Sequence, residues 1–191
     1  MYVLSALVGD NKYLGYVFAP EIWYWRFVRK VITALNLRDD VKILIKPPLK
    51  GRYPQIENPI FEWVERSGIR DIEIIEDVFL DTVIDLADFF ILDSPSTPLV
   101  NLLVTEKPFI LYADRVFYHF VTEAQDKIRR RAAFVDNEND FFSELENQIN
   151  TNFSSINVKN KEFLQNYCTH LNDGKSTERF FGFLNNIYNR S

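Results

Sequence analysis

Residues 87–98, Ala-Asp-Phe-Phe-Ile-Leu-Asp-Ser-Pro-Ser-Thr-Pro, pass from an apolar run into a polar turn. The apolar run, 89–92, shows no polar alternation, as expected for a strand that is buried on both faces. Ser and Thr are favoured just before a helix, and Pro98 suits its first turn. A second apolar run, 108–112, follows closely. The stretch therefore predicts a strand, a helix and a second strand of a parallel sheet.

The same alternation continues on both sides of this unit. Parallel strands need crossover connections, and helices in these connections cover both faces of the sheet. The sequence therefore predicts an α/β fold with a doubly wound, mainly parallel sheet, as a single domain over 1–191 with a helical tail from about 140 to 191. Further strands are expected at 1–8, 41–45, 72–75 and 132–136, and helices at 20–37, 58–66, 80–87, 98–104, 140–150, 159–168 and 177–188.

Two expectations about packing follow from this assignment. The last helix carries Phe180, Leu184 and Ile187 at helical spacing, so we expect this face to pack on the domain. Strand residues should be buried in the sheet, namely Ile43, Ile74, Phe90, Ile91, Ile110 and Leu111.

The composition narrows the functional class. With 22 basic and 27 acidic residues, the net charge of -5 argues against nucleic acid as a partner. The apolar start, 1–8, is too short to cross a bilayer, so no transmembrane segment is expected. Cys168 is the only cysteine, which excludes an internal disulfide and indicates a reducing, cytoplasmic location. A dinucleotide fingerprint and a Walker loop are missing, and we expect neither a metal nor a cofactor.

Candidate binding residues follow the predicted strands. In open parallel sheets, ligands bind beyond the carboxyl ends of the strands. There the 93–97 turn offers hydroxyl groups and the backbone N–H groups of a helix start, which suit an anion. Lys46 and Arg52, after an earlier strand, would add cations for a diphosphate. Plain helix capping and a solvated basic loop remain the alternatives.

Three segments resemble a known family. Residues 87–97, with 106–112 (Glu-Lys-Pro-Phe-Ile-Leu-Tyr), are similar to the nucleotide-binding, Rossmann-like C-terminal half of GT-B transferases that build bacterial surface polysaccharides and teichoic acids. The glycerophosphotransferase-like branch is the most similar. Residues 173–179, Asp-Gly-Lys-Ser-Thr-Glu-Arg, resemble a segment near the end of many of those proteins.

The resemblance implies a donor, a site and a partner. The donor is a nucleotide-diphosphate sugar or CDP-glycerol, and the acceptor-binding half is expected in a preceding domain or a partner subunit. A peripheral position at the inner membrane face is compatible with this activity. By the resemblance, the donor phosphates are bound by Ser94, Ser96, Thr97, Lys46 and Arg52, and the nucleotide and ribose by Asn101, Glu76 and Asp93.

Catalytic residues stay unassigned, and two other functions stay open. The family often has a His-Pro pair after the second strand, where this chain has Lys46-Pro47-Pro48. A non-catalytic nucleotide-sugar-binding or scaffold subunit is therefore the alternative. A receiver-like signalling module fits less well, because Lys107 precedes its strand instead of following it. A metal-binding Asp-x-Asp, expected of a GT-A transferase, is not found.

Overall fold

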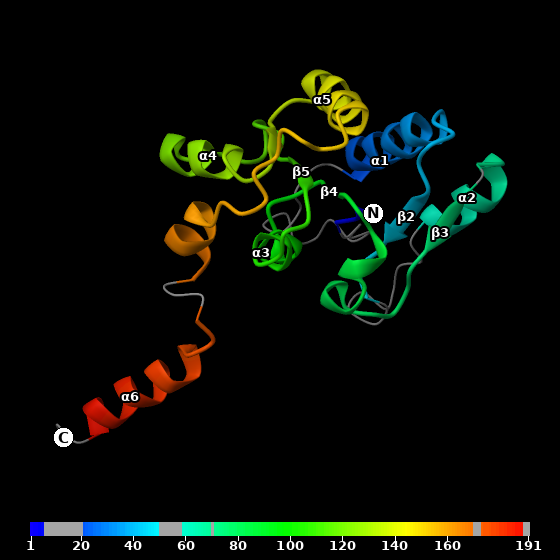
Figure 1. The fold of residues 1–191 in the computed structure, drawn as a ribbon. Coiled ribbons are helices and arrows are strands. Elements are labelled where there is room, and N and C mark those ends of the chain that lie inside the picture. The colour runs from blue at the N-terminus through cyan, green and yellow to red at the C-terminus, as the bar shows by residue number, and fades with distance from the viewer. Residues whose placement is uncertain (6–20, 50–58, 70, 170–172, 189–191) are drawn as a thin grey trace.

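The computed structural model describes residues 1–5, 21–49, 59–69, 71–169 and 173–188 (Figure 1). Within them, six strands form one sheet whose neighbours are all parallel. The strand order is β3-β2-β1-β4-β5-β6. The chain therefore adds β2 and β3 on one side of β1 and then β4, β5 and β6 on the other, so the order reverses between β1 and β4. This confirms the predicted doubly wound α/β fold. The strands are β1 (Tyr2–Val3), β2 (Ile43–Lys46), β3 (Ile72–Ile74), β4 (Phe90–Leu92), β5 (Phe109–Tyr112) and β6 (Ala133–Val135).

Helices cover both faces of this sheet. The α-helices are α1 (Glu21–Asn36), α2 (Ile60–Ser67), α3 (Thr97–Leu103), α4 (Thr122–Arg129), α5 (Glu138–Asn150) and α6 (Ser176–Tyr188). The described residues also form two 3₁₀ helices, η2 (Leu80–Thr82) and η3 (Ile84–Leu86), and a π-helical turn, η4 (Leu164–Cys168). None of the helices in the described ranges is long and apolar enough to cross a lipid bilayer.

The core has two layers, one on each face of the sheet. α3, η2, η3, α4 and η4 contribute to one layer, and α1, α2 and α5 contribute to the other. Five of the six strand residues expected to be buried are buried, and Ile74 is only half-buried. β3, which carries Ile74, is an edge strand with one neighbour, and less of the fold covers it.

The segment predicted as one helix, 80–87, forms two short 3₁₀ helices instead, over 80–82 and 84–86. Val83 separates η2 from η3, with φ -124° and ψ 7°. Thr82, Val83 and Ile84 are consecutive β-branched residues, which lose side-chain freedom in a helix. Burial of Leu80, Val83 and Ile84 against the sheet holds the segment in this form.

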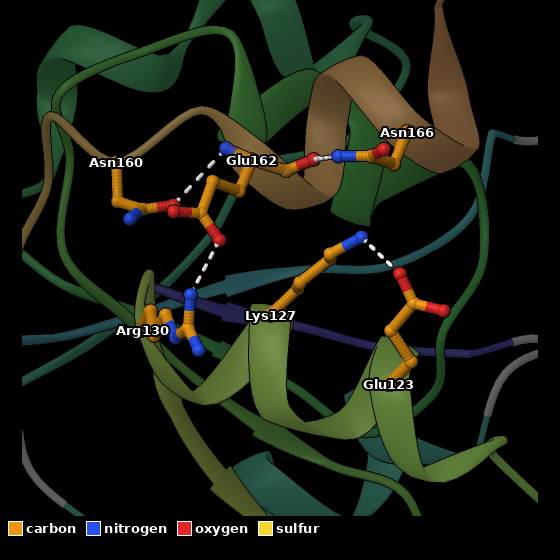
Figure 2. Close-up of polar contacts among 6 residues, drawn as sticks. All are labelled: Glu123, Lys127, Arg130, Asn160, Glu162 and Asn166. Atoms are coloured by element: carbon orange, nitrogen blue, oxygen red, sulfur yellow. Dashed lines mark hydrogen bonds and ion pairs between the residues drawn. The ribbon is translucent and has the colours of Figure 1, made fainter.

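The segment from 159 to 168 is also less regular than predicted, since its helical part is mainly the π-turn η4. Figure 2 shows how it is tied to α4. Arg130 Nη1 lies 2.8 Å from Glu162 Oε2. Asn160 Oδ1 accepts the Glu162 N–H at 3.0 Å, and Asn166 Nδ2 donates to the Glu162 carbonyl at 2.6 Å. Polar contacts at one glutamate thus fix the segment.

α6 does not pack on the domain, which contradicts the prediction from its aromatic spacing. Figure 1 shows the helix extending away from the sheet. Phe180 is 58% exposed and Ile187 53% exposed. Local contacts explain its form: Asp173 accepts the Lys175 N–H at 3.0 Å and lies 2.9 Å from Arg179 Nη1. The Asp-Gly-Lys-Ser-Thr-Glu-Arg segment therefore organises the start of α6 without contacts to the sheet.

Removal of residues 173–191 should leave the rest of the fold as stable as before. α6 has no buried side chain, so we expect the free energy of unfolding to change by less than about 0.5 kcal/mol in urea denaturation. Leu164→Ala is the control, because Leu164 is 1% exposed and its truncation should cost about 2 to 5 kcal/mol. A loss of several kcal/mol on deletion would show that α6 packs against the protein in solution.

Candidate functional site

The candidate site lies at the carboxyl ends of β1 and β4, where the strand order reverses. Ser5 follows β1, and Asp93 follows β4 directly. Ser5 Oγ donates to Asp93 Oδ1 at 2.6 Å, and the Ser5 N–H donates to the same oxygen at 3.1 Å. These two bonds join the ends of the two central strands.

Asp93 is enclosed by donors from its own chain. Tyr24, on α1, places its hydroxyl 2.7 Å from Asp93 Oδ2 and 3.1 Å from the Ser5 carbonyl oxygen. Asp93 is 8% exposed. Burial raises its pKa, and hydrogen bonds from Ser5 and Tyr24 offset part of the rise. The carboxyl group therefore holds two strands and a helix together through neutral donors.

A chain of serine hydroxyls leads outward from this carboxyl group. Ser5 Oγ lies 2.6 Å from Ser94 Oγ, which lies 3.0 Å from Ser96 Oγ. Ser94 is buried, and Ser96 is half-buried at the start of α3. Ser96 occupies the N-cap position but makes no side-chain capping bond, so its hydroxyl belongs to the serine chain and not to the helix. This geometry disfavours plain capping as the role of Ser96.

The protonation state of Asp93 sets the direction of the serine chain. Each hydroxyl has one proton to donate and lone pairs to accept with. When Asp93 is ionised, Ser5 donates to it, and Ser94 and Ser96 must donate inward in turn. When Asp93 carries a proton, the order can reverse, and Ser96 then directs its proton outward. Only in the second state can Ser96 offer its O–H group to a bound anion.

Lys46 ends β2 at the same edge of the sheet. It is 4% exposed, and its Nζ donates to the Pro47 carbonyl oxygen at 2.7 Å. Burial lowers the pKa of Lys46, and the negative charge of Asp77 offsets part of this effect. Val3 is the register partner of both Lys46 and Leu92, so β1 separates the lysine from the end of β4. In the described part of the chain, Lys46 makes no hydrogen bond to the serines.

The other predicted residues lie around this edge without joining the serine chain. Thr97 is exposed at the start of α3, and Asn101 is half-buried one turn later. Glu76 is half-buried after β3, which β2 and β1 separate from β4. Arg52 lies outside the described residues. The structure thus brings Asp93, Ser94 and Ser96 into one cluster, and within the part of the chain that it describes Lys46, Thr97 and Asn101 make no hydrogen bond to these serines.

Two cations hold the far end of α3. Arg131 is fully buried, and its Nη2 donates to the carbonyl oxygens of Leu102, Thr105 and Lys107 at 3.0 to 3.1 Å. Burial lowers the pKa of Arg131 to about 10. Lys161 Nζ also donates to Thr105, at 3.1 Å. Cations are favourable at the carboxyl end of a helix, so both side chains fix the helix whose other end carries Ser96.

Sequence reasoning missed three residues of this cluster. Ser5 had a detectable signal, since it is the first polar residue after an apolar strand. Tyr24 had no such signal in the sequence, because it lies in an aromatic stretch that is typical of a hydrophobic core. Tyr118, in the segment after β5, interacts with Ser94; burial and the Asp93 charge raise the pKa of Tyr118, and the Ser94 contact lowers it. Tertiary structure alone brings both tyrosines to the serines.

The described residues hold no group of three His, Cys, Asp or Glu side chains that could bind a metal ion. Comparisons of the chain with protein-family models, curated protein sequences and solved structures yield no match.

Asp93→Asn should preserve the contacts of the cluster while removing its charge. The amide oxygen can accept from Ser5, and the amide N–H can donate to the Tyr24 hydroxyl. Because folding raises the pKa of Asp93, ionisation costs stability; the cost is absent below the ordinary Asp pKa of about 3.9 and grows until the pH exceeds the raised value. In urea denaturation, the free energy of unfolding of the variant should increase relative to that of wild type as pH rises from about 3 to 7.

Two further variants test this interpretation. Asp93→Leu removes the acceptors as well as the charge, so it should destabilise by about 1 to 3 kcal/mol for each donor left buried without a partner. Asp81→Asn alters an exposed carboxylate and should track wild type at every pH. A constant stability difference between Asp93→Asn and wild type across this pH range would contradict a raised pKa at Asp93.

Proposed function

We propose that the carboxyl edge of this sheet binds a nucleotide-diphosphate donor, and that the protein passes a sugar or glycerol phosphate from it to a surface-polymer precursor. The observation that carries the proposal is the serine chain from Ser5 through Ser94 to Ser96, placed where the strand order reverses. Ligands of open parallel sheets bind at this point. The resemblance of residues 87–97, 106–112 and 173–179 to GT-B transferases supports the same placement.

Hydroxyl groups and a lysine are the proposed contacts for the diphosphate. α3 has only seven residues, so its dipole is a minor contribution. Ser96 and Thr97 would donate O–H bonds to phosphate oxygens, with Asp93 protonated so that the serine chain points outward. Lys46 would exchange the Pro47 carbonyl for a phosphate oxygen. Its burial favours this exchange, because an anion compensates a desolvated ammonium group better than a carbonyl does.

Catalysis in this proposal is positional and electrostatic. As the donor bond breaks, charge grows on the departing nucleotide diphosphate, and the hydroxyls and Lys46 stabilise that charge. An acceptor-binding domain or partner subunit would supply the other wall of the site. The lone Cys168 supports a cytoplasmic location, and a polymer precursor held by lipid would bring the protein to the inner membrane face.

The second candidate is a nucleotide-sugar-binding subunit without turnover. One observation favours it: Asp93, the carboxyl group at the centre of the site, is engaged by Ser5 and Tyr24. A carboxylate held in this way orders the loop and is poorly placed to act as a base. Turnover assays of the protein with its acceptor-binding partner separate the two candidates, because both predict donor binding and only the transferase predicts product.

Donor binding should raise the melting temperature of the full chain. At a ligand concentration of about 100 times Kd, binding to the folded state alone contributes about 2.7 kcal/mol. In a domain of this size that corresponds to a rise of about 5 to 11 °C. Thermal unfolding with UDP, CDP, GDP, ADP and their sugar or glycerol conjugates measures the effect. The proposal fails if all of these ligands leave the melting temperature unchanged.

Variants then locate the site. Ser96→Ala with Thr97→Ala should weaken the ligand-induced rise at little cost in stability, since Ser96 makes no capping bond. Adding Lys46→Met, which keeps the apolar stem, should weaken it further. Thr33→Ala with Ser154→Ala is the matched control, because both residues are exposed and lie outside the cluster. Full retention of the rise in the triple variant would place the ligand elsewhere.

Binding should also depend on pH with a definite sign. Protonated Asp93 permits the outward serine orientation, so donor affinity should fall as pH rises through the raised pKa of Asp93. Isothermal titration of the donor between about pH 5 and 8 measures this. In Asp93→Asn, position 93 no longer titrates, so the donor affinity should not change with pH across this range. An equally steep pH dependence in the variant would assign the titration to another group.

A further inference from the structure

Two aromatic dipeptides frame the serine chain. On α1, the Tyr24 hydroxyl lies 2.7 Å from Asp93 Oδ2, and Trp23 precedes Tyr24 in the sequence. After β5, Tyr118 interacts with Ser94, and Phe117 precedes it. Each dipeptide thus places its tyrosine in the cluster. The two preceding rings therefore belong to the same two segments that bring Tyr24 and Tyr118 to the cluster.

The rings of Trp23 and Phe117 contact each other in an edge-to-face arrangement, with centroids 6.3 Å apart and planes at 71°. Trp23 is nevertheless 56% exposed. The other two tryptophans are half-buried and pair with each other, at 5.8 Å between Trp25 and Trp63. Among the described residues, Phe117 is the aromatic ring in contact with Trp23, and more than half of the Trp23 surface remains accessible.

Exposed apolar side chains adjoin this ring in the sequence. Ile22 is 56% exposed and Val116 is 65% exposed. An exposed apolar surface on the two segments that also bring tyrosines to a cluster of hydroxyls would match a ligand with a flat apolar part joined to a polar one. A nucleotide diphosphate has this composition, because its base stacks on aromatic rings and its phosphates accept hydrogen bonds. Pyrophosphate or glycerol phosphate alone would leave the aromatic surface uncovered.

We propose that Trp23 is the stacking platform for the base of the bound nucleotide, with Phe117 fixing the orientation of the Trp23 ring. This inference rests on the proposed function and adds the way in which the nucleotide is recognised: through its base, by Trp23, as well as through its phosphates. Stacking is tolerant of base identity, so the platform sets the affinity for nucleotides and does not choose among bases.

Isothermal titration of the full chain with ADP, UDP, CDP, GDP and inorganic pyrophosphate tests the inference. Trp23→Ala should weaken nucleotide binding by about 5- to 150-fold and leave pyrophosphate binding unchanged. Trp23→Phe keeps a ring and should retain most of the affinity. Nucleotide binding should quench the wild-type tryptophan fluorescence, and this quenching should be lost in Trp23→Phe. Phe79→Ala removes an aromatic side chain that is 65% exposed and serves as the matched control.

The outcomes separate this inference from the proposed function. If wild type binds neither nucleotides nor pyrophosphate, the proposed function fails and the platform fails with it. If Trp23→Ala binds nucleotides like wild type while Ser96→Ala with Thr97→Ala does not, the platform alone is wrong. Equal weakening of nucleotide and pyrophosphate would show that Trp23 supports the site without contacting the base. A wild-type dimer that Trp23→Ala dissociates, with nucleotide affinity unchanged, would make the ring pair a protein interface.

Discussion

Ser5 Oγ lies 2.6 Å from Asp93 Oδ1, and this contact joins the two strands between which the chain reverses its direction of growth. α1, which follows β1, packs on one face of the sheet, while α3, which follows β4, packs on the other. The helices that follow these two strands thus lie on opposite faces of the sheet, and the hydrogen bonds of Ser5 to Asp93 hold the two strand ends together. Tyr24 adds α1 to the same carboxyl group. The buried Asp93 carboxyl group is therefore part of the candidate site and also joins the two strands between which the strand order reverses.

α3 shows how a short helix is held in place. Its start is tied to β1 by serine hydroxyls, and its carboxyl end is held by Arg131 and Lys161. Arg131 also lies over the Phe109 ring, at 4.9 Å from the centroid. Isolated helices of this length are unstable in water. The position of Ser96 therefore depends on contacts at both ends of α3 and on the core beneath it.

Much of the fold could be predicted from the sequence, because continuous apolar runs between turn residues identify buried parallel strands. The serine cluster was found in part for the same reason, since Asp93, Ser94 and Ser96 follow such a run. Periodicity could not distinguish the exposed face of α6 from a packed one. Nor could it place Tyr24 against Asp93, because that contact depends on how α1 crosses the sheet. The hydrogen bonds of Arg131 to the end of α3 were hidden for a similar reason, because an arginine at a helix end is typically solvated.

Ser96 occupies the N-cap position of α3 without making a capping bond, and this affects how mutant phenotypes at the cluster can be interpreted. Most residues of the cluster serve the fold and the site at once, so a phenotype at Asp93 or Tyr24 mixes protein abundance with function. Ser96 makes no capping bond and Trp23 is mostly exposed, so selection for stability exerts little pressure on either. Cellular protein levels should therefore be insensitive to substitution at these two positions. Any loss of fitness from such changes would report on function alone.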